Sequence, residues 1–115
     1  MLDIRVDSVN HDDVVVVLRG ELDYATSARL RAAITALLNR GGFAGIALDL
    51  GGVEFLDSIG VGTIVVALRI CQQVGVRLKV TAASAHAARL LQVTGVGEAL
   101  GLPAGTDEEA VAAIS

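Results

Sequence analysis

The segment Leu48–Arg69, LDLGGVEFLDSIGVGTIVVALR, is the most informative part of the sequence for predicting the fold. An apolar stretch typical of a buried strand gives way here to a long apolar helix, and Ser58 stands at the junction. Asp57 precedes the serine, and Gly60 and Gly62 follow it within the first helical turn. The segment therefore predicts a strand followed by a helix, with polar groups at the start of the helix.

Apolar spacing on both sides of this segment predicts the other elements. Alternation over 2–6 and a β-branched run over 14–20, separated by polar residues 10–13, indicate an antiparallel pair of strands. Three- and four-residue spacing predicts a helix over 26–40, which ends at Gly41-Gly42. The remaining predicted elements are strands at 45–50 and 76–82 and helices at 58–73, 85–93 and 108–114.

The order of these elements predicts a single α/β domain over residues 1–115, since this length suits one compact domain. Strands alternating with helices favour parallel pairing through right-handed crossovers. We therefore expect a mixed, mostly parallel sheet with an N-terminal antiparallel hairpin, flanked by about four helices.

Composition argues against several classes of partner. The formal net charge is −4 and only 3% of residues are aromatic, so the chain lacks the basic surface and stacking side chains typical of nucleic-acid binding. The apolar run Ile64–Leu68 is ended by Arg69, so no direct membrane insertion is expected. A single cysteine, Cys71, and an N-terminus without a basic, apolar leader favour a reduced, cytoplasmic location.

Catalytic and cofactor motifs are incomplete. A hydrolase elbow would require glycine two residues before Ser58, where Leu56 stands. His11 falls in a predicted turn and His86 at a predicted helix start, where solvated polar residues are common. No His or Cys pair has metal-ligand spacing, and Gly60-Val61-Gly62 lacks the lysine and the third glycine of nucleotide-binding loops. We expect no enzyme activity, no metal and no cofactor.

The residues alone allow two interpretations of the role of Ser58. It can be the N-cap of the helix, which stabilises a helix by about 0.5–2 kcal/mol relative to alanine. Alternatively, it can be a functional hydroxyl, because Gly60 and Gly62 each cost the helix about 0.5–1 kcal/mol and something must offset that cost. Tight packing of the helix start and close approach of a partner's nucleotide both explain the glycines. Apolar residues lie nearly all round the helix, and those that do not face the sheet are either covered by neighbouring helices or offered to a partner.

Two motifs carry a family resemblance. GELDYATSARL (Gly20–Leu30) and LDLGGVEFLDSIGVGTIV (Leu48–Val66) resemble, in order and spacing, the STAS domain of bacterial anti-sigma factor antagonists, and the likeness covers nearly the whole chain. The resemblance implies a non-catalytic protein whose unphosphorylated form binds an anti-sigma factor that is a serine kinase, which frees a sigma factor. ATP-dependent phosphorylation ends this association, and a metal-dependent serine phosphatase reverses it.

The resemblance also implies roles for individual residues. Ser58 would be the phosphoacceptor. The partner-binding residues would be Asp23, Thr26, Asp57, Ile59, Gly60, Val61 and Gly62. Asp23 also fits a cap or turn residue before the first helix. Other functions stay open: a non-catalytic regulatory subunit of a transporter or signalling assembly, or a nucleotide-binding or hydrolytic module built on Ser58.

Overall fold

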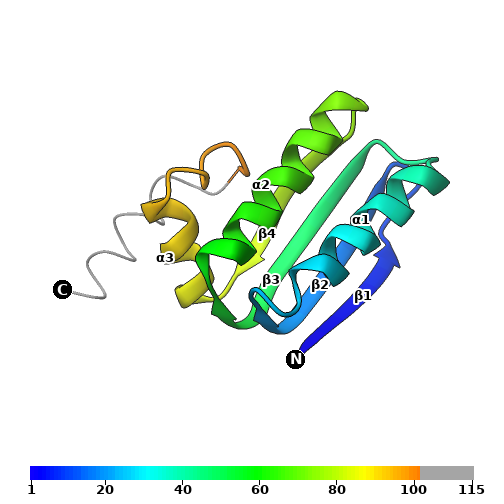
Figure 1. The fold of residues 1–115 in the computed structure, drawn as a ribbon. Coiled ribbons are helices and arrows are strands. Elements are labelled where there is room, and N and C mark those ends of the chain that lie inside the picture. Colours follow the sequence, from blue (N-terminus) through cyan, green and yellow to red (C-terminus); the bar gives the residue numbers. More distant parts are fainter. Residues whose placement is uncertain (102–115) are drawn as a thin grey trace.

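A computed structural model of the protein describes residues 1–101. The elements follow one another as β1 (Leu2–Ser8), β2 (Asp13–Leu22), α1 (Ser27–Arg40), β3 (Gly45–Leu56), α2 (Ser58–Gln73), β4 (Arg77–Ala83) and α3 (Ala85–Val93). The sheet has the order β1-β2-β3-β4, with β1 antiparallel to β2 and the other pairs parallel (Figure 1). These elements confirm the predicted α/β fold and its N-terminal hairpin. The helix expected at 108–114 lies outside the described residues.

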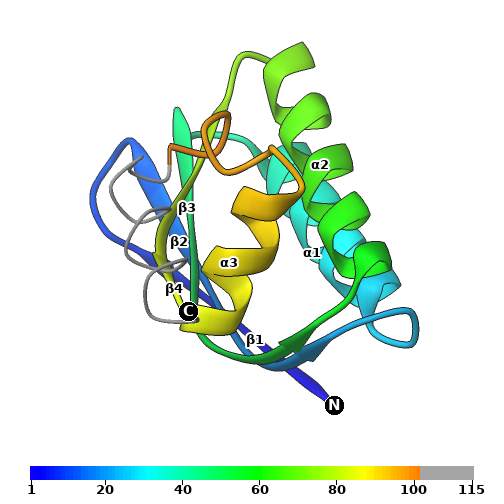
Figure 2. The same ribbon diagram turned by 90° about the vertical axis from the view of Figure 1, so that its left-hand side faces the viewer.

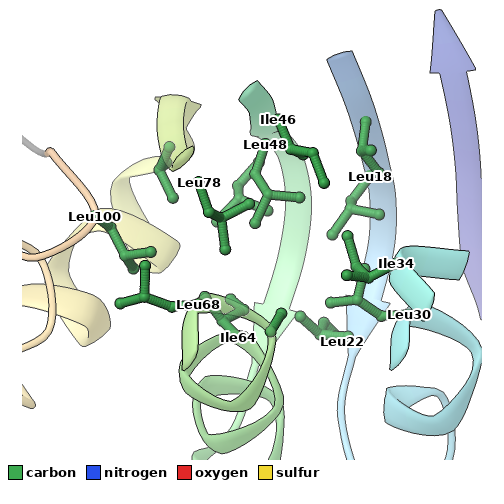
Figure 3. Packing of buried hydrophobic residues seen from close by; sticks show 14 of the residues in the cluster. Leu18, Leu22, Leu30, Ile34, Ile46, Leu48, Ile64, Leu68, Leu78 and Leu100 are labelled. Atoms are coloured by element: carbon green, nitrogen blue, oxygen red, sulfur yellow. The ribbon is translucent and has the colours of Figure 1, made fainter. Parts of the chain in front are cut away.

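All three described helices lie on one face of the sheet (Figure 2). The strands send alternate side chains into this layer, so Val14, Val16 and Leu18 of β2 are buried while Val15 and Val17 are only half-buried. Figure 3 shows how side chains from the strands and from α1 and α2 meet in the core. The core residues labelled there are Leu18, Leu22, Leu30, Ile34, Ile46, Leu48, Ile64, Leu68, Leu78 and Leu100.

Strand β3 is six residues longer than predicted, because Gly51 and Gly52 do not end it. They lie where the register between β2 and β3 shifts, and a Cβ on Gly52 would come within 2.8 Å of Cγ of Arg19. Glycines inside a strand often mark such irregular pairing, where a neighbour approaches closely. The extra residues carry β3 beyond its last pair with β4, Leu50 with Ala83, and lead directly into α2.

Side chains from the start of α3 bind carbonyl groups near this end of β3, which pairs with β2 but not with β4. Ser84 Oγ donates to the Val53 carbonyl at 2.7 Å, and His86 Nε2 lies 3.3 Å from the Leu56 carbonyl oxygen. Ser84 also accepts from the backbone N–H of Ala87, which confirms it as the predicted N-cap of α3. The start of α3 is thereby placed next to the start of α2.

Three properties of residues 1–101 bear on other functions: the state of the cysteine, the length of the helices and the grouping of potential metal ligands. Cys71 is buried and free, and burial raises the pKa of its thiol above the ordinary value. Within these residues no helix is long and apolar enough to span a bilayer. The same part of the chain contains no group of three or more His, Cys, Asp or Glu side chains placed to hold a metal ion.

Candidate functional site

The N-cap of α2 is Asp57, so the prediction that Ser58 could be the cap is wrong. Asp57 has an extended backbone, and its Oδ1 accepts a hydrogen bond from the Gly60 N–H at 2.8 Å. The Asp57 carbonyl accepts from the N–H of Val61 at 3.0 Å. A carboxylate at this position reaches the third residue of the helix, which is the usual geometry of an aspartate cap. Ser58 is consequently the first residue of the helix.

Because Asp57 and not Ser58 caps the helix, the hydroxyl of Ser58 is accessible. Ser58 is exposed, and within the described part of the chain its side chain makes no hydrogen bond. It stands at the N-terminus of a 16-residue helix, where unpaired N–H groups and the helix dipole create a positive potential. The hydroxyl is thus open to a partner, in surroundings that tolerate a negative charge.

The loop between β2 and α1 is organised by Asp23 and Thr26. Asp23 Oδ1 accepts from the backbone N–H groups of Ala25 and Thr26, at 3.0 and 3.2 Å. The Thr26 hydroxyl donates to the Glu21 carbonyl at 2.8 Å and accepts from the N–H of Asp23 at 3.0 Å. Asp23 is therefore a turn residue, as one reading of the sequence held, and it stays partly exposed. Thr26 is only 8% exposed, so it shapes the loop from inside.

Asp57 joins this loop to the start of α2. Its second carboxylate oxygen, Oδ2, accepts from the N–H of Tyr24 at 3.2 Å, and its own N–H lies 3.4 Å from the Leu22 carbonyl oxygen. The two sequence motifs thus meet through one carboxylate, between residues 33 positions apart in the chain. Neither Asp57, next to Ser58, nor Asp23, in the loop that Asp57 binds, forms an ion pair with a described residue, so no described cation offsets the charge of either acid.

Exposed apolar side chains lie on the three segments that meet at the start of α2. Tyr24 is 81% exposed and Ile59 48%, and Phe55 is also exposed. Ile59, Gly62 and Val66 are exposed at helical spacing along the outer side of α2. We call these residues, namely Tyr24, Phe55, Ser58, Ile59, Gly62 and Val66, the Ser58 surface. An apolar surface of this kind at a polar site is typical of protein–protein contact.

Two members of this surface, Tyr24 and Phe55, were missed at the level of sequence. The signal was present, because two of only three aromatic residues in the chain lie within three residues of Asp23 or Asp57. Phe55 also stacks on the exposed ring of His86, with 6.0 Å between centroids and 18° between planes. His86 is therefore not merely a solvated polar residue, since it holds α3 against the end of β3.

The two glycines near the start of α2 have different surroundings. A Cβ on Gly60 would lie 2.3 Å from the Leu22 carbonyl oxygen and 2.8 Å from Cδ1 of Leu56. A Cβ on Gly62 would meet nothing within 4 Å. Tight packing therefore explains why position 60 is a glycine. At position 62 a side chain would fit, so the glycine there leaves open space on the Ser58 surface. Val61 is 6% exposed, so it and Gly60 support the site from below and do not form its surface.

Replacing Asp57 with alanine should lower the free energy of unfolding by about 0.5–2 kcal/mol, because the cap of α2 is lost. Asp57→Asn is the matched control, since its amide oxygen still caps the helix and only the bond from Tyr24 loses its acceptor. In denaturant unfolding, the native protein should be the most stable, the asparagine variant intermediate and the alanine variant the least stable. Equal stability of the alanine variant and the native protein would contradict the capping role.

Comparison with known proteins agrees with this geometry. Residues 6–103 match a protein family described as "Mlab, STAS domain". The anti-sigma F factor antagonist of Lysinibacillus sphaericus is 31% identical over 93 residues, which cover 81% of this chain and 80% of that protein. The unphosphorylated form of the anti-sigma factor antagonist SpoIIAA has 27% identity and a TM-score of 0.73 over 84% of each chain. The phosphorylated form of the Bacillus cell fate determinant SpoIIAA has 24% identity and a TM-score of 0.65, covering 98% of this chain and 100% of that one.

The fold and the matched family together define a small α/β domain of the STAS class. The chain belongs to the STAS domain family, as its two motifs predicted. Within that family it is similar to anti-sigma factor antagonists over most of its length.

Proposed function

We propose that this protein is an anti-sigma factor antagonist controlled by phosphorylation of Ser58. Its unphosphorylated form binds an anti-sigma factor that is a serine kinase, and the sigma factor held by that kinase is released. The observation that carries this proposal is the exposed Ser58 hydroxyl, which has no hydrogen bond to a described residue at the start of α2. The protein acts in the cytoplasm by binding alone, without a cofactor or catalysis of its own.

The surroundings of Ser58 suit a kinase substrate. The kinase must bring its nucleotide within reach of the hydroxyl, and Gly62 leaves open space one helical turn further on. Exposed Tyr24 and Ile59 provide apolar contacts, while the partly exposed carboxylates of Asp23 and Asp57 provide polar ones. Thr26, Gly60 and Val61, which the resemblance also implies as partner-binding residues, are buried beneath these groups, so their part in binding is to hold the surface in shape.

Phosphorylation would switch the partner off without unfolding the domain. A phosphoserine carries about −1.5 to −2 charges at pH 7. The N-terminus of α2 stabilises that charge in the free protein, because the dipole and the free N–H groups of the first turn favour anions. In a complex, the phosphate would be buried against the partner beside two unpaired carboxylates, which opposes association. Structures of SpoIIAA exist in an unphosphorylated and a phosphorylated form, which supports a cycle of phosphorylation for the present chain as well.

The proposal is tested by incubating the purified protein with serine-kinase anti-sigma factors from the same genome and Mg-ATP. Intact-mass and peptide mass spectrometry should then find one phosphate, on Ser58. Ser58→Ala should take up none, whereas Ser8→Ala, at an exposed serine of β1, should be phosphorylated like the native chain.

A metal-dependent serine phosphatase should remove the phosphate again. Absence of phosphate with every such kinase, from a chain shown to be folded, would overturn the proposal. Purification of tagged protein would then show whether it is a regulatory subunit of a transporter or another assembly.

A further inference from the structure

Strand β1 forms an open edge of the sheet. It pairs with β2 along its whole length, and no other described element lies along its outer side (Figure 1). The opposite edge, β4, is partly occupied, because the Val80 N–H donates to the Leu100 carbonyl at 2.9 Å. An open edge carries unpaired N–H and carbonyl groups that can bind another strand.

The register shows which groups of β1 point outward. Glu21 N–H donates to the Met1 carbonyl and Val9 N–H to the Asp13 carbonyl, so Leu2 and Ser8 occupy positions without direct bonds to their partners on β2. Hydrogen-bonded and non-bonded positions alternate along an antiparallel pair. The outward-pointing backbone groups are consequently those of the even-numbered residues, Leu2, Ile4, Val6 and Ser8.

The side chains of β1 form a charge pattern that complements itself. Asp3, Arg5 and Asp7 lie on the face without helices, paired with β2 residues 19, 17 and 15, and Arg5 Nε donates to Asp7 Oδ2 at 2.9 Å. Val6 lies on the helix face opposite Val16 and is 40% exposed. If a second copy paired with β1 antiparallel about a two-fold axis at Arg5, the two Arg5 side chains would face one another and each Asp3 would face an Asp7. A copy centred on Val6 places each Arg5 beside the partner's Asp7.

We propose that two copies of this chain associate through β1, antiparallel, about a two-fold axis at Val6. The backbone of Val6 pairs with the backbone of Val6 in the second copy, and Ile4 pairs with Ser8 on each side. The four charges of Arg5 and Asp7 then alternate in sign across the interface, and the two Val6 side chains cover one another. A continuous sheet results, with four described strands from each copy.

A second register, centred on Ile4, would also pair opposite charges, Arg5 with Asp3. It requires the outward carbonyl of Leu2 as an acceptor for the second copy. That carbonyl already accepts a hydrogen bond from Nη1 of Arg29, on α1. The register centred on Val6 uses no backbone group that is bonded within the chain, and this difference selects it.

The test is the dimer dissociation constant of the full chain at low salt, from analytical ultracentrifugation. Arg5→Glu and Asp7→Arg should each weaken association about tenfold, because two attractive pairs become repulsive. An equimolar mixture of these two variants should recover it, since every facing pair is again attractive. Asp3→Arg is the matched control and should leave the constant within about twofold, because Asp3 faces no charge in this register.

Val6→Pro removes an outward N–H that β2 does not use, so it should abolish association while circular dichroism shows a folded domain. A monomer at all concentrations, undiminished association of Val6→Pro, or sensitivity to Asp3→Arg and not to Asp7→Arg would each overturn the proposal. The interface contains no residue of the Ser58 surface. Phosphorylation of Ser58 in the monomeric variants therefore separates failure of this proposal from failure of the proposed function.

Discussion

Ser58→Asp is expected to bind the cognate kinase at least about 100-fold more weakly than the native protein, whereas Ser58→Ala should bind it normally. The carboxylate would enter the interface beside Asp57 and Asp23, neither of which is paired with a described cation. Burying a further unpaired charge next to two acids costs several kcal/mol in comparable interfaces. Alanine adds no charge, and the cap of α2 is provided by Asp57, so it changes neither the repulsion nor the helix start.

Ser58→Asn is the matched control, because it has the size of aspartate without its charge. Isothermal titration calorimetry with the purified kinase should place it within a few-fold of the native protein. The melting temperature of Ser58→Asp should equal or slightly exceed that of the native protein, since an acid in the first turn of a helix is favourable. Native-like affinity of Ser58→Asp would show that charge repulsion does not drive the switch.

Gly60→Ala is expected to lower the free energy of unfolding by about 1–3 kcal/mol, although alanine is normally the better helix former. The new methyl group would lie 2.3 Å from the Leu22 carbonyl oxygen, which is backbone and cannot turn aside. Relief requires the start of α2 to move away from the end of β2. Because Asp57 binds Tyr24 across the same gap, that movement should also weaken kinase binding.

Gly62→Ala provides the comparison within the same helix turn. Its Cβ meets nothing within 4 Å, so the substitution should raise the free energy of unfolding by about 0.5–1 kcal/mol through helix propensity alone. Urea unfolding of both variants measures the difference. Equal effects of the two substitutions would contradict the packing described at Gly60. A loss of kinase affinity in Gly62→Ala, despite its added stability, would show that the partner approaches the helix there.

Much of the fold could be predicted from local patterns. Period-two and helical spacing located every described element, and the ends of all of them except β3 to within a few residues, since buried faces of strands and helices must repeat with the geometry of those elements. The end of β3 was missed because Gly51-Gly52 looks like a strand terminator. Only pairing with β2 shows that the strand continues through a shift in register.

For the site, the sequence alone identified the kinds of residue involved: an acid, a serine and glycines at a helix start, together with a second acidic motif. The tertiary structure decided their roles. Whether Ser58 or Asp57 caps α2 depends on which oxygen reaches the Gly60 N–H. Whether a glycine is needed depends on what lies opposite it, which is the Leu22 carbonyl for Gly60 and open space for Gly62. The first depends on where β3 ends, which its pairing with β2 determines. The second is a distance between segments far apart in the chain, and local residue patterns carry no information about such distances.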